Sequence, residues 1–392
     1  MISVAEALAH VFALSPVLPC EEVALSDAAG RVLRRPVIAA RDQPPFPASA
    51  MDGYAVAASS GHGPLKVIGE AAAGGAFDGA LKPGEAVRIF TGAPVPTGAD
   101  CVIIQEDVAV SSDTVTLRET PRTGLNIRRQ ALDFRAHDSL SAPRRLCPVD
   151  LALIAAMNCP RVVVSRRPEV ALIMTGDELV LPGEEPRADQ IIASNAFAIK
   201  AIAEAEGAVA RILPVARDTE ASLRAVFELA SGADMVITIG GASIGAHDLV
   251  GPVARAMGAT QAFYKIAMRP GKPLMAGQLR RSMLLGLPGN PVSSIVCAHI
   301  FMRPALRAML GLGAHPLPTA TASLGADLPT NGPRTHYMRA RLSPGPTITP
   351  LPDQDSALLS VLAEADALLI QPAHDPGRNK GEEIRYIPFH PA

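Results

Sequence analysis

Two apolar runs that each end in a glycine-rich turn constrain the fold of this 392-residue chain more than any other feature. The run at 235–239 leads into Gly240-Gly241-Ala242-Ser243-Ile244-Gly245, and the run at 283–287 leads into Pro288-Gly289-Asn290-Pro291. Short apolar runs of this kind are typical of buried parallel strands, and Pro291 at the end of the second turn favours a helix start. Because glycine lets backbone N–H groups approach a ligand and helix N-termini favour anions, the two turns predict an anion-binding pocket.

Strand-like and helix-like patterns alternate around these runs. We expect strands at 170–174 and 209–213, and helices at 195–206, 219–230 and about 292–310. Alternation at this spacing predicts a doubly wound parallel sheet. Ligands of such sheets bind at the carboxyl ends of the strands, where the glycine turns and Thr175-Gly176-Asp177-Glu178 lie.

The chain is too long for one ordinary core, and its Pro/Gly-rich parts predict β domains beside the α/β core. The expected fold is multidomain α/β plus all-β, with a C-terminal β-barrel-like domain. A helix at 150–157, with Asp150 as its N-cap, is expected to pack beside one at 4–14. The predicted domains are a discontinuous helical and extended N-terminal domain (1–41 and 135–168), an inserted small β domain (42–134), a doubly wound α/β domain (169–314) and a C-terminal β domain (315–392).

Composition excludes several classes of protein. The net charge is −2, tryptophan is absent and aromatic residues make up 4%, which argues against a nucleic-acid partner. The longest apolar windows are far shorter than a membrane span, which argues against a membrane partner. Five cysteines without a C-x-x-C pair, and an N-terminus without a signal layout, predict a cytoplasmic protein.

Three carboxylates are expected at the carboxyl edge of the sheet: Glu178, Asp218 and Asp248. The alternative for Asp218 and for Asp248 is a helix N-cap. Glu178 has no such structural role, because it follows a strand-ending turn. Three carboxylates at adjacent strand ends predict a Mg²⁺ site beside a phosphate.

Lys265, Arg269 and Lys272 fall within eight residues, and Pro270 and Pro273 stiffen the segment. The alternative is a solvated basic face, the usual environment of Lys and Arg. Interleaved Gly and Pro favour a fixed anion-binding loop instead. The chain has no G-x-x-x-x-G-K-[ST] motif and no dinucleotide fingerprint, which argues against a P-loop NTPase and a nicotinamide enzyme.

Longer motifs are more specific than these turns. Ser49-Ala50-Met51-Asp52-Gly53-Tyr54-Ala55 follows a proline-rich hinge and enters the inserted domain. The others are Thr91-Gly92-Ala93-Pro94-Val95-Pro96, Asn126-Ile127-Arg128-Arg129, Thr175-Gly176-Asp177-Glu178-Leu179, Gly240-Gly241-Ala242-Ser243-Ile244-Gly245 with Asp248, Arg269-Pro270-Gly271-Lys272-Pro273 and Leu287-Pro288-Gly289-Asn290-Pro291. On the basis of these motifs, the chain resembles the molybdopterin molybdotransferase family, which includes bacterial MoeA proteins and the E domain of gephyrin.

The resemblance implies an activity in molybdenum cofactor biosynthesis: Mg²⁺-dependent insertion of molybdate into adenylylated molybdopterin, with release of AMP. It implies an elongated homodimer, in which 1–41 and 135–168 form the dimerisation domain, and a pterin adenylyltransferase as substrate donor. The residues implied in cleavage and Mg²⁺ binding are Asp52, Thr91, Asp133, Glu178, Asp218, Asp248 and Lys265. Those implied in molybdate binding are Arg269, Lys272, Pro273, Ser293, Arg339 and Ser356. Those implied in holding the pterin substrate are Gly240, Gly241, Ser243, Gly245, Pro288, Gly289 and Asn290.

Four places depart from the family pattern. Arg269 stands where lysine is usual, and Pro47 and Ala48 stand where Asp and Asn are usual before Ser49. Asp133 follows Gln130-Ala131-Leu132 instead of glycine, and the segment around Ser356 matches loosely. Two alternatives stay open: a pterin adenylyltransferase-like enzyme of the same superfamily, and a non-catalytic scaffold with this fold. The choice between molybdenum and tungsten is also open.

Overall fold

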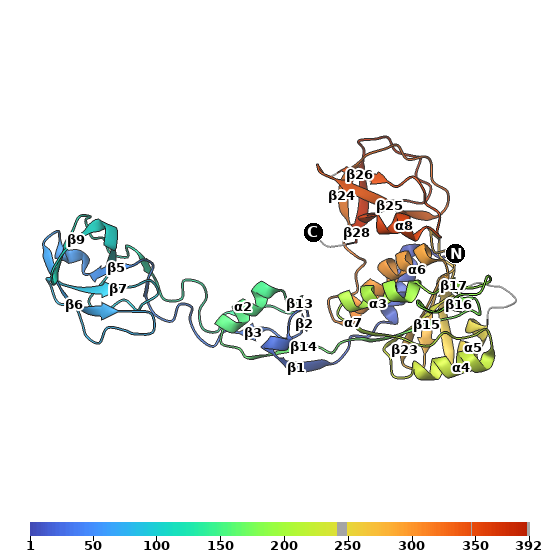
Figure 1. Ribbon diagram of the computed structural model, residues 1–392, viewed down its shortest axis with the longest axis horizontal. Helices are drawn as coiled ribbons and strands as arrows, with labels where there is room; N and C mark the ends of the chain where they lie inside the picture. Colours follow the sequence, from blue (N-terminus) through green and yellow to red (C-terminus); the bar gives the residue numbers. More distant parts are fainter. Residues whose placement is uncertain (241–248, 346, 390–392) are drawn as a thin grey trace. The chain divides into compact units, whose positions relative to one another are not determined.

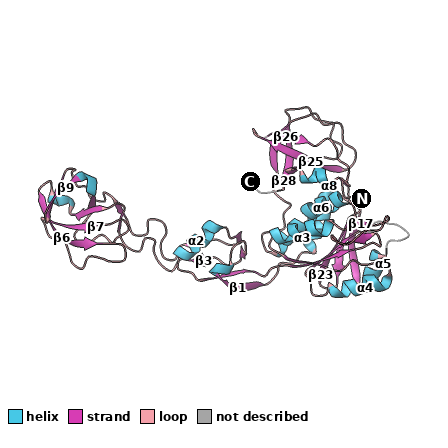
Figure 2. Cartoon of the chain, in the orientation of Figure 1, coloured by secondary structure: helices cyan, strands magenta, loops and turns pink. Residues whose placement is uncertain are grey.

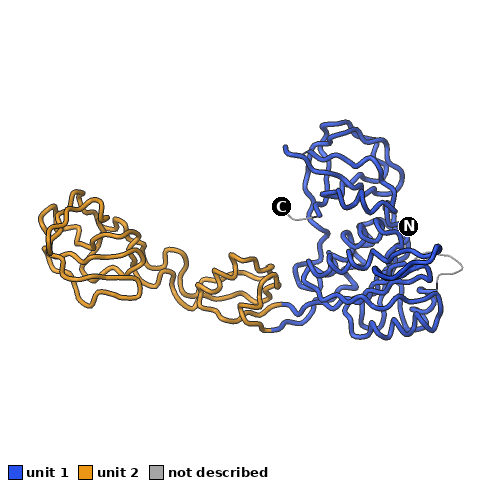
Figure 3. Tube along the Cα trace, in the orientation of Figure 1, with its two compact units in different colours: residues 1–21, 165–392 blue, residues 22–164 orange. Residues whose placement is uncertain are grey.

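The structure is a computed structural model that describes residues 1–240, 249–345 and 347–389. It divides into two compact units, coloured separately in Figure 3. Unit 1 comprises Met1–Glu21 with Ser165–Ala392, and unit 2 comprises Glu22–Val164. The finer division into four domains stays a prediction. No helix within the described ranges is long and apolar enough to cross a bilayer.

One of the two six-stranded sheets of unit 1 has the strand order β18-β15-β19-β23-β22-β20. Its strands β15 and β23 are labelled in Figure 1. Its first four strands are parallel, as predicted, whereas β22 and β20 extend it in antiparallel fashion, with a bulge in β20 between Gln261 and Phe263. The connections change direction at β15, which lies between β18 and β19 and so marks a switch point. The strands are β15 (Glu169–Met174), β18 (Val209–Ile212), β19 (Met235–Ile239), β20 (Ala259–Tyr264), β22 (Met275–Leu279) and β23 (Ser282–Leu287).

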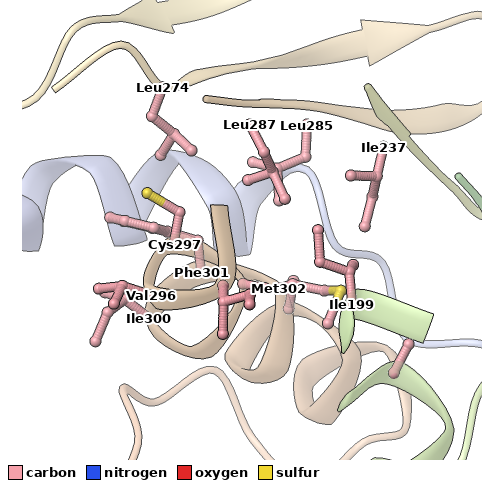
Figure 4. Packing of buried hydrophobic residues seen from close by; sticks show 14 of the residues in the cluster. Ile199, Ile237, Leu274, Leu285, Leu287, Val296, Cys297, Ile300, Phe301 and Met302 are labelled. Atoms are coloured by element: carbon pink, nitrogen blue, oxygen red, sulfur yellow. The ribbon is translucent and has the colours of Figure 1, made fainter. Parts of the chain in front are cut away.

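Helices cover both faces of this sheet. One hydrophobic cluster joins the sheet to α1, α3, α6 and α7, and the other joins it to α4 and α5. Figure 4 shows part of the first cluster, in which Met302 lies near Ile199 of α3; Phe301 and Ile237 of β19 belong to the same cluster. The helices are α1 (Val4–Ala13), α3 (Asn195–Ala205), α4 (Glu220–Leu229), α5 (Val250–Ala256), α6 (Pro291–Cys297) and α7 (Arg303–Met309).

Two helices differ from the sequence expectation. The helix expected at 292–310 contains a π-helical turn, Ala298–Met302, between α6 and α7. Helix α1 begins with a capping box in which Ser3 Oγ accepts from the Glu6 amide and Glu6 accepts from the Ser3 amide. Its buried face packs on α7 and β20 of unit 1, so the expected packing beside the helix at 150–157 is wrong.

The C-terminal part of unit 1 is a closed five-stranded barrel, because β25 pairs with both β26 and β27 in the order β25-β26-β24-β28-β27. The two-residue strand β21 adds to β25 in parallel, and this pairing ties the barrel to the α/β part. The elements are β21 (Met268–Arg269), β24 (Ala320–Leu324), β25 (Thr335–Ser343), β26 (Thr347–Pro350), α8 (Leu359–Ala363), β27 (Ala367–Gln371) and β28 (Glu383–Pro388); the α/β part adds β16 (Leu179–Val180) and β17 (Ile191–Ile192).

Unit 2 consists mainly of short strands (Figure 2), in sheets ordered β8-β5-β7-β6-β10-β9 and β1-β14-β2-β13 and two smaller pairs. Helix α2 begins after Cys147, whose amide donates to the Asp150 carboxylate, so Asp150 caps the helix from its third position rather than as the expected N-cap. The elements are β1 (Cys20–Ala24), η1 (Leu25–Asp27), β2 (Val32–Leu33), β3 (Val37–Ile38), β4 (Ala48–Ser49), β5 (Gly53–Val56), η2 (Ala58–Ser60), β6 (Pro64–Ala71), β7 (Glu85–Ile89), β8 (Cys101–Ile104), η3 (Gln105–Asp107), β9 (Val108–Ser111), β10 (Thr114–Leu117), β11 (Ile127–Arg128), β12 (Ser139–Leu140), β13 (Arg144–Arg145), α2 (Pro148–Ala156) and β14 (Arg161–Ser165).

Candidate functional site

A pocket of about 410 Å³ lies at the carboxyl ends of β15, β19 and β23. These are the strands at the switch point, where doubly wound sheets bind their ligands. The pocket brings together several residues that the sequence predicts for the substrate and adds others that it does not. Its lining includes Thr175, Glu178, Ile191, Ile192, Asn195, Gly240, Pro273, Pro288, Gly289 and Asn290.

The two glycine turns lie against each other in this pocket. A Cβ added to Gly289 would be 3.7 Å from the Gly240 Cα. Gly240 has a φ of +92°, and an added Cβ would lie 2.9 Å from the Thr175 carbonyl oxygen, so only glycine fits there. The Asn195 side chain holds the second turn by donating from Nδ2 to the Gly289 carbonyl at 2.7 Å. The predicted substrate residues Gly241, Ser243 and Gly245 lie outside the described residues.

The carboxylates at this edge come from two neighbouring loops. Glu178 lines the pocket, and an added Cβ at Gly176 would meet its carboxylate. Asp218 is exposed, and its amide donates to the Asp177 carboxylate at 3.2 Å. The N-cap of α4 is Thr219, whose side chain accepts from the Ser222 amide, so the capping alternative for Asp218 is wrong.

Arg217, which the sequence reasoning did not single out, fastens these loops. Its Nη1 lies within hydrogen-bonding distance of the carbonyl oxygens of Gly176, Asp177 and Leu179, at 3.5, 3.1 and 3.2 Å. One guanidinium therefore holds the loop that carries Glu178 against the loop that carries Asp218. No local pattern marks such a contact, because it joins residues about 40 positions apart.

A magnesium site would need hard oxygen ligands, which Glu178 and Asp218 can supply. Within the described ranges, no three His, Cys, Asp or Glu side chains lie close enough to hold a metal ion. The third predicted ligand, Asp248, lies outside the described residues. The donor chemistry of the two described carboxylates therefore fits Mg²⁺, while a complete set of ligands depends on Asp248.

The predicted cationic segment follows β20. Lys265 has a φ of +68°, and its Nζ lies 5.3 Å from the centre of the Tyr264 ring. Arg269 ends β21, and both Arg269 and Lys272 are exposed. Pro273, from the same segment, lines the pocket. The exposed positive charges of Arg269 and Lys272 thus lie on the segment that leads to Pro273 in the pocket wall.

Arg339, which the resemblance implies in molybdate binding, is only 2% exposed, and two of its nitrogens are occupied by carbonyl oxygens. Its Nη1 and Nη2 donate to the carbonyl oxygens of Asp355 and Asp353 at 2.8 and 3.0 Å. Its amide and carbonyl bond the Gln354 side chain at 3.0 Å each. Burial lowers the pKa of Arg339 and outweighs the opposing effect of the Asp353 and Asp355 charges. Arg339 thus holds the loop that precedes Ser356.

That loop is joined to the start of α6. The Asn290 side chain donates to Ser356 Oγ at 3.0 Å, and the Val292 amide donates to the Ser356 carbonyl at 3.1 Å. Ser293 is buried in the first turn of α6. Ser356 and Asn290 therefore lie together at the pocket rim, which places one predicted molybdate residue beside one predicted substrate residue.

In unit 2, Asp52 and Thr91 form a pair. Asp52 Oδ1 accepts from the Thr91 amide and from the Thr91 hydroxyl, both at 2.7 Å. These two bonds, and then the charge of Arg88, hold the pKa of Asp52 below its ordinary value. Asp133 is exposed, and no hydrogen bond in the described part of the chain joins its carboxylate to this pair; its amide donates to the Gln43 carbonyl.

Three family models match consecutive segments of the chain. Residues 2–158 match the MoeA N-terminal region (domain I and II), 171–308 match a probable molybdopterin binding domain, and 321–389 match the MoeA C-terminal region (domain IV). Together these matches cover both units and follow the order of the resemblance seen in the sequence.

Relatives and a solved structure agree with these matches. The chain is 36% identical to the molybdopterin molybdenumtransferase of Nostoc sp., over 80% of this chain and 75% of that protein. It is 38% identical to the enzyme of the same name from Haemophilus influenzae, over 74% and 73%. The crystal structure of the molybdopterin biosynthesis moea protein from Pyrococcus horikosii superposes with a TM-score of 0.84, at 29% identity and full coverage of both chains. The chain therefore belongs to the molybdopterin molybdenumtransferase family.

Proposed function

We propose that this chain inserts molybdate into adenylylated molybdopterin and releases AMP, as a transferase of molybdenum cofactor biosynthesis. One observation carries the proposal: the glycine-turn pocket at the switch point opens beside an exposed cationic segment. Backbone N–H groups of such turns suit a phosphate, and fixed positive side chains suit a tetrahedral dianion. The family name of the relatives supports the same reaction.

The residues divide by the charge that they present. Glycines 240 and 289, with Asn290, are proposed to hold the pterin phosphate. Arg269 and Lys272 are proposed to attract the molybdate dianion through their positive charge, whereas carboxylates would repel it. Arg339 and Ser293 act at a distance, since both are buried, and Arg339 positions Ser356 for the anion.

Magnesium is proposed to assist cleavage of the pyrophosphate link. Glu178, Asp218 and Asp248 would hold it, and a bound Mg²⁺ would reduce the negative charge that the link presents to an incoming nucleophile. Asp52, held ionised by Thr91, and Lys265 are proposed to act at the same link, with Asp133 as a further carboxylate of unit 2.

The experiment measures AMP release and cofactor formation from adenylylated molybdopterin, Mg²⁺ and molybdate. Lys272→Ala should weaken molybdate use by about 1.5–3 kcal/mol, roughly tenfold or more, because a charge-assisted hydrogen bond is lost. Lys380→Ala, an exposed lysine of the barrel region, is the matched control. An unchanged molybdate dependence together with a loss of pterin binding would assign the cationic segment to the pterin phosphate.

The oligomeric state and the surroundings of the enzyme are further parts of the proposal. We propose a homodimer in the cytoplasm that receives its substrate from a pterin adenylyltransferase. A dimer predicts a doubled mass in light scattering and, if the two subunits share a site, partial recovery of activity when inactive Asp52→Asn and Glu178→Gln subunits are mixed. Full mixing without recovery would contradict a shared site.

A further inference from the structure

An arginine held between two aromatic rings lies beside Asp52 in unit 2. Arg88 of β7 pairs directly with Tyr54 of β5 and stands two residues before Phe90. Its guanidinium carbon lies 5.0 Å from the centre of the Tyr54 ring and 5.2 Å from that of Phe90. Because residues two apart in an extended segment share a face, the two rings restrict the guanidinium from the same side of the sheet.

A hydrogen-bond network links this arginine to Asp52. Arg88 Nη2 donates to the Gln105 side-chain oxygen at 2.7 Å, and the Gln105 amide donates to the Asp52 carbonyl at 3.1 Å. Thr91 fixes the Asp52 carboxylate from the other direction. The cation and the carboxylate are therefore both fixed before any ligand arrives, which lowers the entropic cost of binding one.

Arg88 has no salt-bridge partner among the described residues, although its charge acts on Asp52. None of the ion pairs within the described ranges includes Arg88. A guanidinium has five N–H donors, and the Gln105 bond uses one of them. A fixed planar guanidinium with donors left over matches the oxygens of a phosphoryl group.

We propose that Arg88 is a substrate-binding residue that holds a phosphoryl group of the substrate beside Asp52. This inference rests on the proposed function, in which the substrate contains a pyrophosphate link. A carboxylate that works next to such a link faces repulsion from its negative charge. Arg88 offsets that repulsion and lets Asp52 stay ionised close to the phosphate.

The first test measures binding of inorganic pyrophosphate by calorimetry on the full chain. Arg88→Met keeps most of the apolar stem and removes the charge, so affinity should fall roughly tenfold. Arg88→Lys should fall at least about threefold, because an ammonium group lacks the planar fork. Arg118→Met, an exposed arginine of unit 2, should bind as the wild type does. Wild-type affinity in either Arg88 variant overturns the proposal, and if Arg88→Met does not fold, Arg88→Lys decides alone.

The second test separates this inference from the proposed reaction. With adenylylated molybdopterin as substrate, Arg88→Met should raise KM by about tenfold and leave kcat less affected. A lowered kcat with an unchanged KM overturns substrate binding by Arg88. If the wild type releases no AMP, the proposed function fails, while the pyrophosphate measurement still decides the role of Arg88.

Discussion

Replacing Gln354 with alanine should loosen the loop that carries Ser356 without touching any charge. Three hydrogen bonds are lost: from the Arg339 amide to Oε1 at 3.0 Å, and from Nε2 to the carbonyls of Arg339 and Leu351 at 3.0 and 2.7 Å. Each such bond contributes about 0.5–1.5 kcal/mol net, and the buried Arg339 amide is left without an acceptor. We therefore expect a local destabilisation of about 2–4 kcal/mol.

Hydrogen exchange reports this loss directly. The Leu351 amide, which donates to the Arg339 carbonyl at 2.9 Å, should exchange roughly 30-fold faster or more, since every 1.4 kcal/mol is a factor of ten. Molybdate dependence should weaken in parallel, because Ser356 loses its fixed position. Gln278→Ala, an exposed glutamine of β22, is the control. Unchanged exchange at Leu351 would refute the assignment of Gln354 and Arg339 as the supports of this loop.

Three further predictions concern stability and pH. Gly53→Ala should destabilise unit 2 in thermal unfolding, because an added Cβ would collide with a backbone carbonyl of β8, whereas Gly63→Ala meets nothing within 4 Å and should not. Thr91→Val should raise the lowered pKa of Asp52, so the acid limb of AMP release should move to higher pH. The stabilisation from the Thr91–Asp52 hydrogen bonds is present above the ordinary carboxyl pKa and is lost as pH falls through the lowered pKa. Burial, followed by nearby arginines, lowers the pKa of His336 to about 4, so between pH 6.5 and 4 the unfolded chain binds the extra proton. As the pH falls from 6.5 to 4, the free energy of unfolding of the wild type should therefore decrease by up to about 3 kcal/mol more than that of His336→Gln, as urea titrations would measure.

The sequence predicts the α/β core well because its signals are local. The strands at 170–174 and 235–239 and the helix at 219–230 appear within a residue or two of the expected ends. Their apolar periods suffice, since each element buries its own face. The antiparallel strands β22 and β20 were missed because their apolar content does not reveal strand direction.

The site was predicted only where one segment supplies the chemistry. Gly240, the turn at 288–291 and Glu178 line the pocket, and their roles in binding stay predictions. Arg217 was missed because it bonds carbonyl oxygens about 40 positions away, and Arg88 because two of its contacts, Tyr54 and Gln105, are distant in the sequence. Arg339, predicted from the resemblance as a molybdate ligand, is buried and supports the loop before Ser356, and its role toward molybdate stays a prediction. Long-range hydrogen bonds of this kind leave no periodic trace.

The bulge in β20 has a consequence for self-association. A barrel that closes on itself offers no strand edge to another chain, but the sheet of the α/β part has two edge strands, β18 and β20. At β20 the register shifts between Gln261 and Phe263, which bends the outer row of backbone groups away from a flat template. Deleting Ala262 would straighten that row. We expect the shortened chain to aggregate faster on heating than the wild type, as light scattering would record.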